Sequence, residues 1–371
     1  MTKLEELIQE LCPDGVEFCP LEQCCNILDR KRKPVTKSAR EAGDYPYYGA
    51  NGIQDYVSDY IFDGTFILVG EDGSVITDRG TPVVTWASGK IWVNNHAHII
   101  EESGDVLLRY LYHYIQTIDV SPLIHGNIPK LTGGDFKALQ IPVPPLPVQR
   151  EIVRILDNFT ELTAELTAEL TARKKQYAYY RDKLLTMGTE QVAVCNLGDI
   201  ADIYTGSKPN EILDTISDYE YINAGTGNSG YTEQPNCEGD TVTTPSRGQG
   251  GIGYVGYQSK PFYLGPLCYA IRSKTQEFII NKYIYHWLVS HSSDILVLKN
   301  EGGTPALNKT DLAKIRIKVP PLSVQNRLVE VLDNFDAICT DLSSGLPAEI
   351  EARQKQYEYY RDKLLSFEEK I

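Results

Sequence analysis

The chain has 371 residues, enough for two or three domains, and its hydrophobic share of 42% and charged share of 23% are those of an ordinary globular protein. No apolar run of about 18 residues occurs and the N-terminus has no apolar stretch, so we expect neither a transmembrane helix nor a secretory signal. The net charge of −14 argues against a surface coated by nucleic acid, although it leaves room for a local basic site. Eight cysteines without regular spacing predict free thiols in a reducing cytoplasm, and neither a disulfide framework nor a zinc site.

Internal duplication is the strongest feature of the sequence. Lys175–Leu185 recurs as Lys355–Leu365, with ten of eleven positions identical. Two shorter motifs upstream are repeated in the same order, Pro144–Gln149 as Pro320–Gln325 and Leu156–Phe159 as Leu332–Phe335. The chain is therefore two tandem units, each a variable region followed by a nearly invariant one.

The invariant regions predict long helices. From Pro147 to Met187 apolar residues recur at alternating steps of four and three, the seam of a coiled coil about 60 Å long. The two Thr-Ala-Glu-Leu tetrads of residues 163–170 insert a stutter into that seam. In the second copy, Gly345 and Pro347 should break or kink the helix. The predicted seam consists of Ile152, Ile155, Phe159, Leu162, Leu166, Leu170, Tyr177, Tyr180, Leu184, Leu332, Phe335, Tyr357, Tyr360 and Leu364.

The variable regions are rich in Gly, Tyr, Asn and β-branched residues and predict compact α+β domains with many loops. Strand-like runs occur at 65–69 and 253–257, and helical stretches near 105–117 and 278–290. Tyr110, Tyr112, Tyr283 and Tyr285 have helical spacing and are expected in the cores. The predicted domains are 1–146 (first recognition domain), 147–188 (central helix), 189–322 (second recognition domain) and 323–371 (C-terminal helix).

With these motifs the sequence resembles the specificity subunits of type I restriction–modification enzymes along its whole length. The resemblance rests on the Pro-Pro-Leu-x-x-Gln entry, the Leu-Asp-Asn-Phe turn and the Lys-Gln-Tyr-x-Tyr-Tyr-Arg-Asp-Lys-Leu-Leu exit of each unit, and the tetrads are similar to those of the type IC branch. It implies an α+β fold of two globular target-recognition domains separated by two long antiparallel coiled-coil helices, with pseudo-two-fold symmetry. Each domain would then read one half of an asymmetric, bipartite DNA target. One tetrad adds about 6 Å of helix and about 40° beyond a full turn, and one DNA base pair adds about 3.4 Å and about 35°. Because the rotations nearly match, a tetrad can step the unread gap by one base pair.

Residues that could contact DNA are basic groups for phosphates and amides, guanidinium groups and hydroxyls for base edges. The basic cluster of residues 30–33 in an acidic chain is read equally well as phosphate contacts or as a solvated loop. The predicted set is Arg30, Lys31, Arg32, Lys33, Lys37, Asn51, Arg79, Lys90, Asn94, Asn95, His96, Lys130, Lys208, Asn223, Asn228, Ser246, Arg247, Gln249, Lys260, Asn308 and Lys309. Each one singly is more often a turn or surface residue.

Catalytic motifs are missing, so we expect a non-catalytic subunit without a cofactor. No amino-methyltransferase motif, cofactor-binding loop or P-loop occurs, and His96 and His98 have no third metal ligand in sequence. Pro13-Asp14 with Asp29-Arg-Lys31 loosely fits a PD-(D/E)xK nuclease, which is a weak alternative. The resemblance implies that two modification subunits supply S-adenosylmethionine-dependent adenine methylation, and that restriction subunits supply ATP- and Mg-dependent translocation and cleavage in the cytoplasm.

Two other interpretations stay open. A coiled-coil scaffold that displays two ligand-binding domains not directed at DNA fits the duplicated seam and the acidity equally well. An assembly that only methylates, without a nuclease, has the same sequence features.

Overall fold

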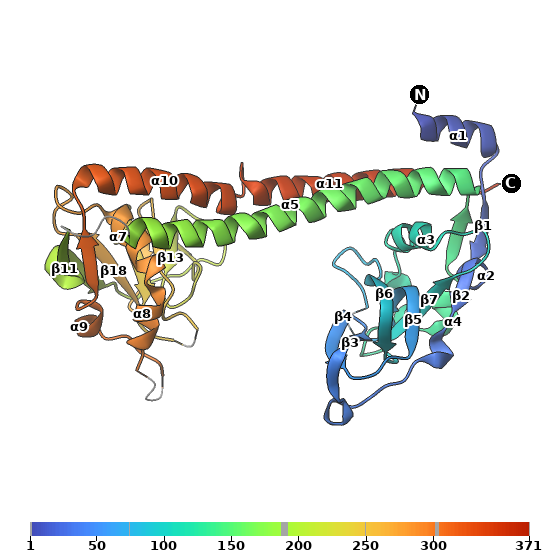
Figure 1. The fold of residues 1–371 in the computed structure, drawn as a ribbon, viewed down its shortest axis with the longest axis horizontal. Helices are drawn as coiled ribbons and strands as arrows, with labels where there is room; N and C mark the ends of the chain where they lie inside the picture. The colour runs from blue at the N-terminus through green and yellow to red at the C-terminus, as the bar shows by residue number, and fades with distance from the viewer. Residues whose placement is uncertain (1, 74, 187–191, 249, 301–303, 371) are drawn as a thin grey trace. The chain divides into compact units, whose positions relative to one another are not determined.

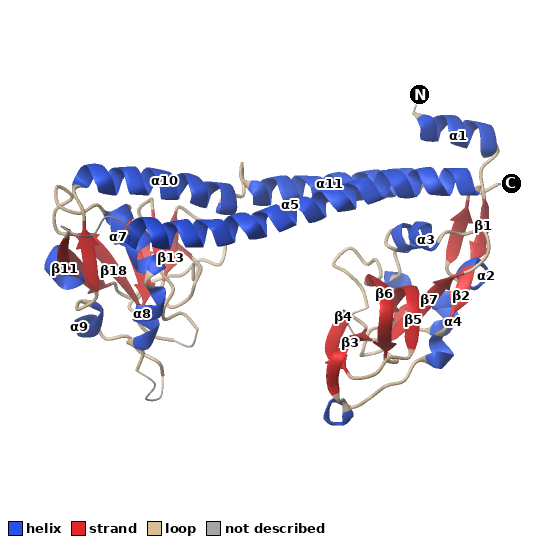
Figure 2. Ribbon diagram, viewed as in Figure 1, coloured by secondary structure: helices blue, strands red, loops and turns tan. Residues whose placement is uncertain are grey.

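A computed structural model describes residues 2–73, 75–186, 192–248, 250–300 and 304–370. The chain divides into two compact units, unit 1 being Met1–Leu166 with Ile350–Ile371 and unit 2 being Thr167–Glu349. Both units combine helices and strands (Figure 2). The division falls within the long helices, so each unit consists of a variable domain and the helical segments packed on it.

Unit 1 begins with a helix that the sequence analysis did not predict, α1 (Lys3–Leu11), which Thr2 and Glu5 cap reciprocally. The elements that follow are β1 (Glu17–Pro20), α2 (Leu21–Cys24), β2 (Cys25–Ile27), the 3₁₀ turns η1 (Asp29–Lys31) and η2 (Lys37–Ala39), β3 (Ala42–Gly49), β4 (Gly52–Val57), β5 (Phe62–Gly70), β6 (Val84–Val93), β7 (Ala97–Glu102), α3 (Leu108–Ile115), η3 (Ser121–Leu123), β8 (Ile124–His125), β9 (Lys130–Leu131), α4 (Gly133–Lys137), β10 (Gln140–Val143) and the start of α5 (Leu146–Thr186).

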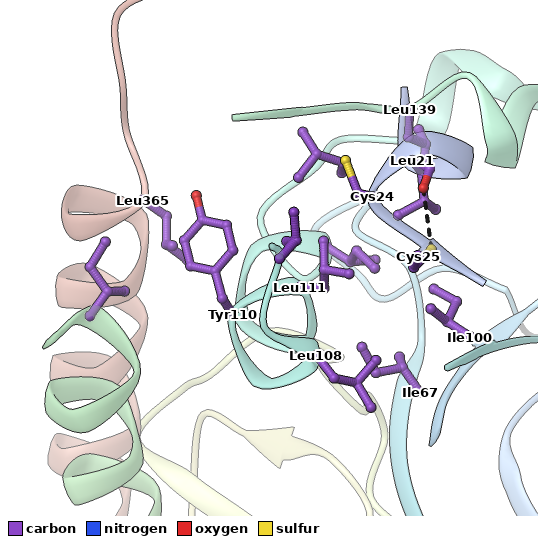
Figure 3. Close-up of a cluster of buried hydrophobic side chains, with 14 of the residues drawn as sticks. Leu21, Cys24, Cys25, Ile67, Ile100, Leu108, Tyr110, Leu111, Leu139 and Leu365 are labelled. Atoms are coloured by element: carbon purple, nitrogen blue, oxygen red, sulfur yellow. Dashed lines mark hydrogen bonds between the residues drawn. The ribbon is translucent and has the colours of Figure 1, made fainter. Parts of the chain in front are cut away.

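The centre of unit 1 is a six-stranded sheet in the order β2-β7-β5-β6-β3-β4, in which only β3 and β6 pair in parallel. β1 pairs separately with β10, and β8 with β9. A core of buried side chains joins the sheet to α3 and to the long helices. It includes Ile67 of β5, Tyr110 of α3 and Leu365, which follows α11 (Leu346–Leu364), as Figure 3 shows. The first domain therefore needs residues from the far end of the chain to complete its core.

Unit 2 repeats this plan with shorter strands. Its elements are β11 (Ala193–Asn196), α6 (Leu197–Ile200), β12 (Ala201–Thr205), β13 (Tyr219–Ile222), β14 (Tyr231–Thr232), β15 (Thr241–Pro245), β16 (Gly256–Gln258), β17 (Tyr263–Leu264), β18 (Cys268–Ser273), α7 (Asn281–Ser290), α8 (Ser292–Val297), α9 (Lys309–Leu312), β19 (Arg316–Val319) and α10 (Leu322–Thr340). The strands form sheets in the orders β12-β18-β15-β16, β14-β13-β17 and β11-β19. As in unit 1, one pair is parallel, here β13 with β17.

The helices predicted near 105–117 and 278–290 are confirmed as α3 and α7, and the run 65–69 lies in β5. The run 253–257 was only partly right, because β16 begins at Gly256 and the residues before it form turns. Tyr110 and Tyr283 are buried as predicted, and their hydroxyl groups donate to the carbonyl groups of Pro142 and Lys318.

The long helices follow the invariant sequence. α5 runs unbroken through both tetrads, whereas the C-terminal helix is interrupted between α10 and α11 near Gly345 and Pro347, as predicted. Within the predicted C-terminal segment 323–371, the helix ends at Leu364. The residues after it lie beside Val16, because the amide N–H groups of Val16 and Lys370 bond to the carbonyl groups of Glu368 and Val16. None of the helices described is long and apolar enough to span a bilayer.

Within each unit the invariant helices pack antiparallel to each other (Figure 1). In unit 1 the Phe159 ring of α5 stacks on Tyr360 of α11 at 5.4 Å, and in unit 2 the Tyr180 ring stacks on Phe335 of α10 at 6.4 Å. Among the predicted seam residues, Ile152 and Leu332 are fully buried, but Leu162 is 45% exposed. The remaining seam residues are partly buried, except Tyr180, which is exposed.

Candidate nucleic-acid interface

The basic segment of unit 1 has one inward and several outward side chains. Its inward member, Arg32, is only 12% exposed and donates to Glu71 (2.6 Å) and to the carbonyl group of Ala97 (2.6 Å). Arg30, Lys31 and Lys33 are exposed. Arg32 was therefore wrongly grouped with its neighbours, because its guanidinium group is committed to holding the segment on the sheet.

A polar cluster around His98 and Asp29 holds the start of this segment in place. The His98 ring lies 2.6 Å from Asp29 through Nδ1, 3.1 Å from the carbonyl oxygen of Leu131 through Nε2, and stacks on the Phe136 ring at 4.1 Å. Burial acts to raise the pKa of Asp29, but hydrogen bonds from His98 and the amide N–H of Ile99 outweigh it and lower that pKa. The carboxylate is thereby kept charged and paired.

The ligand atoms of Asp29, Glu71 and His98 lie within 4.8 Å of one another, the spacing of a metal site. The sequence had offered His98 no third ligand, and the fold supplies two carboxylates. However, Arg32 pairs with both carboxylates, Lys130 pairs with Glu71 (3.2 Å), and both nitrogens of His98 face oxygen atoms. We therefore read the cluster as an ion-pair network. The same contacts give Asp29 a structural role, so the PD-(D/E)xK nuclease pattern is not needed to explain this carboxylate.

Several predicted DNA contacts of unit 1 have internal partners instead. Asn94 is 2% exposed, donates to Gln54 and accepts from the amide N–H of His96, so its assignment as a base reader was wrong. Arg79 pairs with Glu358 of α11 (2.8 Å), and the His96 ring pairs with Asp72. Lys130 is tied to Glu71, as described above. Arg79, His96 and Lys130 are nevertheless exposed, and so are the other predicted residues of this unit apart from Arg32 and Asn94, namely Arg30, Lys31, Lys33, Lys37, Asn51, Lys90 and Asn95.

Unit 2 divides in the same way. Asn223 accepts from the amide N–H of Leu267 (3.0 Å), and Ser246 is 5% exposed, so both serve the fold. Asn308 donates to Asp311 at the start of α9 (3.2 Å) but stays exposed. Gln249 lies outside the described residues. The other predicted residues, all exposed, are Lys208, Asn228, Arg247, Lys260 and Lys309.

The β3–β4 hairpin presents a surface that the sequence analysis missed. Asn51 lies in its turn, and Ile53 (46% exposed) and Tyr56 (52% exposed) follow on the edge strand β4. A two-stranded ribbon fits the major groove of DNA, where an apolar side chain can contact a thymine methyl group and an amide can bond to adenine. The available signal was the Asn51-Gly52 turn pair beside a segment with β-branched and aromatic residues.

A second set of contacts explains the repeated motifs. In unit 1 the buried Gln149 of α5 accepts from the amide N–H of Leu107 (2.9 Å) and donates to the carbonyl groups of Asp105 (3.0 Å) and Pro144 (2.7 Å). In unit 2, Gln325 of α10 makes the matching three bonds: it accepts from the amide N–H of Ile280 (3.1 Å) and donates to the carbonyl groups of Phe278 (2.9 Å) and Pro320 (2.7 Å). The glutamine of each entry motif thus fastens a helix to its own variable domain.

The aspartate of each Leu-Asp-Asn-Phe motif also attaches a helix to its variable domain. Asp157 lies 2.9 Å from Nε2 of His113, whose Nδ1 lies 2.9 Å from the hydroxyl group of Tyr357 on α11. Burial acts to raise the pKa of Asp157, but His113 and Arg109 outweigh it and lower that pKa, while burial lowers the pKa of His113. A neutral ring that donates to Asp157 and accepts from Tyr357 fits both bonds.

Unit 2 contains the same network. Asp333 of α10 lies 2.8 Å from Nε2 of His286, and the hydroxyl group of Tyr177 on α5 lies 3.4 Å from Nδ1 of that ring. Burial acts to raise the pKa of Asp333, and His286 and Lys282 together outweigh it and lower that pKa. Each domain is thus held by the first part of one invariant helix and the last part of the other.

The exit motifs also keep one exposed face in both copies. Tyr179 and Tyr359 are 60% and 61% exposed, and Lys175 and Lys355 are exposed one helical turn before them. These positions lie on the same face of the helix, away from the buried tyrosines of the network. The contacts that attach each helix to its domain, made by the entry glutamine and the His–Asp–Tyr network, do not involve these exposed residues. Those contacts therefore do not explain why the residues are identical in the two copies.

Comparisons with known proteins agree with this architecture. A family model described as the type I restriction modification DNA specificity domain matches residues 13–173 and 189–352. A putative type I restriction enzyme specificity subunit of Haemophilus influenzae is 36% identical over 99% of this chain and 98% of its own length. The EcoR124I/EcoR124II specificity subunit of Escherichia coli is also 36% identical, over 79% of this chain and 80% of its own.

Solved structures share the fold. The S subunit of a type I restriction–modification system from M. genitalium has a TM-score of 0.63 at 19% identity and covers 95% of this chain and 96% of its own. A chain from a study of complex assembly and conformational transition of the type I system has a TM-score of 0.57 at 15% identity, covering 95% and 98%.

Proposed function

Because the chain belongs to the DNA specificity subunits of type I restriction–modification systems, we propose that it selects an asymmetric bipartite DNA target, with one half read by each variable domain. The subunit itself is non-catalytic and assembles with the other subunits of its system and with DNA. The observation that carries the proposal is that two unlike domains are attached to the invariant helices through the same contacts. These contacts are made by Gln149 and Gln325 and by the two His–Asp–Tyr networks. Identical mounts and different loops suit two readers of different sequences.

We assign phosphate contacts to the exposed lysines and arginines of each domain, because such contacts supply affinity without sequence information. In unit 1 these include Lys31, Lys33 and Lys37, and in unit 2 Lys208 and Arg247. Base reading in unit 1 falls to the β3–β4 hairpin. In unit 2 it falls to the loop that carries Asn228, the matching connection after β13.

The repeated exposed face of the exit motifs fits two copies of one partner. We propose that two modification subunits dock there and supply S-adenosylmethionine-dependent methylation of one adenine in each half-site. Restriction subunits with ATP and Mg join this core, and an assembly without them methylates only. All eight cysteines are free, which suits work on DNA in the reducing cytoplasm.

The test is to express the chain with its modification subunit in a host that lacks adenine methylation, and to map N6-methyladenine by single-molecule sequencing. The expected result is one bipartite motif with two different halves and a fixed gap. A matched variant, Asn51→Ala, should alter only the half read by unit 1, while Glu161→Ala, at an exposed position of α5 outside the exit motif, should leave the motif unchanged. Methylation at a single continuous motif, or none with a correctly assembled complex, contradicts the proposal.

A further inference from the structure

Both domains retain the same aromatic pair although most of their surface differs. In unit 1, Tyr47 of β3 lies opposite Trp92 of β6 in the parallel pairing, and the rings are 6.5 Å apart. In unit 2, Tyr221 of β13 lies opposite Tyr263 of β17, also in the parallel pairing, with the rings 6.0 Å apart. These two pairs mark equivalent positions in the two domains.

Each pair is covered by a Lys-Pro segment at the same place. The indole N–H of Trp92 donates to the carbonyl oxygen of Lys33 (2.6 Å), and the hydroxyl group of Tyr263 donates to that of Lys208 (3.5 Å). Pro34 and Pro209 follow these lysines. Lys33-Pro34 and Lys208-Pro209 therefore correspond in structure as well as in sequence.

A pocket opens beside each covered aromatic ring. The pocket of unit 1, about 200 Å³, has Trp92 and Tyr47 in its wall, the residues after Lys33-Pro34 on one side and the end of β4 on the other. The pocket of unit 2, about 380 Å³, has Tyr263 in its wall, Pro209 and the residues after it on one side and the end of β14 on the other. Duplication of the pocket in both domains argues for a shared ligand.

Both pockets are acidic. Glu41 and Asp59 line the first, and Glu211 and Glu233 line the second, and all four residues are exposed. The cation among the described lining residues of the first pocket is Arg40, whose guanidinium group lies over the Tyr47 ring (4.1 Å) and pairs with Asp55 (3.1 Å). Arg40 shows the chemistry of the site, because a cation there finds an aromatic face and a carboxylate together.

We infer that each pocket binds a lysine or arginine side chain of the modification subunit, one copy at each domain. Carboxylates would repel the phosphates of DNA, whereas a cationic side chain gains both the carboxylates and the aromatic wall. The inference rests on the proposed function. It adds a second point of attachment for the modification subunit at each domain, besides the exposed face of the exit motifs. Two equivalent pockets correspond to two copies of the partner.

The test uses the full chain and its co-expressed modification subunit, with stoichiometry from native mass spectrometry and affinity from titration. Glu41→Lys with Asp59→Lys should weaken one of the two partner copies about tenfold, and Glu211→Lys with Glu233→Lys the other, while all four changes together weaken both. Glu10→Lys with Glu22→Lys in unit 1, and Glu277→Lys with Asp294→Lys in unit 2, are matched charge reversals on exposed positions away from the pockets. The neutral set Glu41→Gln with Asp59→Asn keeps the shape and should show the same direction if a reversal variant fails to fold.

Assembly equal to that of the control reversals overturns the inference. So does an increase of DNA affinity in the pocket variants with unchanged assembly, because the pockets would then face DNA. A wild-type chain that binds neither partner nor DNA instead contradicts the proposed function itself, and the pockets with it.

Discussion

His113 of α3 and Asp157 of α5 lie 2.9 Å apart, and the contact joins a variable domain to an invariant helix. Its counterpart, His286 with Asp333, does the same in unit 2 at 2.8 Å. In each unit the ring comes from a helix of the variable domain, α3 or α7, and the carboxylate from the repeated Leu-Asp-Asn-Phe motif. Since both copies keep them, replacing the loops of one domain need not disturb its attachment.

Gln149→Ala should lower the free energy of unfolding of the chain by about 2 kcal/mol or more. The substitution removes a fully buried amide and leaves the amide N–H of Leu107 and two carbonyl groups without their partner. Urea denaturation followed by circular dichroism measures the change. Gln176→Ala, on an exposed position of the same helix, is the control, and equal stability of the two variants would show that the entry glutamine does not fasten the helix.

Stability of unit 1 should fall as the pH drops below about 6.5, the ordinary pKa of histidine. Burial lowers the pKa of His113 in the folded chain, so the unfolded chain takes up its proton first and gains from acidification. The contribution is present above pH 6.5 and is lost as the pH falls toward the lowered pKa. The lowered pKa of Asp157 adds a further loss below about pH 3.8.

Melting temperatures measured between about pH 7.5 and about pH 5.5 test this point. His113→Asn, which cannot titrate, should melt lower at the upper pH but lose less across the range than the wild-type chain. Parallel slopes for the two proteins would assign the pH dependence to other groups.

Arg32→Ala and Lys33→Ala should have opposite consequences although the residues are neighbours. Loss of Arg32 removes a cation shared by Asp29 and Glu71, both partly buried beside His98, and leaves only Lys130 paired with Glu71, which should destabilise the fold by about 2–3 kcal/mol. Loss of exposed Lys33 should leave stability unchanged, weaken binding to all DNA sequences by a similar factor and reduce the salt dependence of binding by about one phosphate contact. Equal effects on folding would contradict the division between inward and outward members of the segment.

Deletion of Thr167–Leu170, one Thr-Ala-Glu-Leu tetrad of α5, should shorten the gap of the methylated motif by one base pair and keep both half-sites. The helix would lose about 6 Å and rotate by about 40° beyond a full turn, and that rotation nearly matches the twist of about 35° per base pair. Single-molecule sequencing of methylated DNA provides the measurement. Replacement of the same tetrad by four alanines is the control for length, and an unchanged gap in the deletion variant would refute the ruler.

Features that depend on local sequence were predictable. The heptad seam gave α5, the Gly345 and Pro347 pair gave the interruption before α11, and helical periodicity gave α3 and α7. The helix α1 was not predicted, although Thr2 and Glu5 form a capping box that is visible in the sequence.

The candidate site was less predictable, because exposure depends on partners that are far away in sequence. Asn94 and Arg32 read as surface groups, yet Gln54 and Glu71 bury them through contacts 40 and 39 residues away. Arg79 meets Glu358 across most of the chain. Residue type alone cannot separate a polar side chain that contacts solvent from one that finishes an internal network.

The core of unit 1 has a consequence for synthesis. Leu365 and the backbone contact of Val16 with Glu368 belong to a domain whose other parts precede residue 167. A nascent chain therefore emerges from the ribosome with its first domain incomplete and waits, at about 5–20 residues per second, on the order of ten seconds or more for the missing helix. During that interval the apolar face of α3 is exposed and can bind chaperones, and the second domain can fold first.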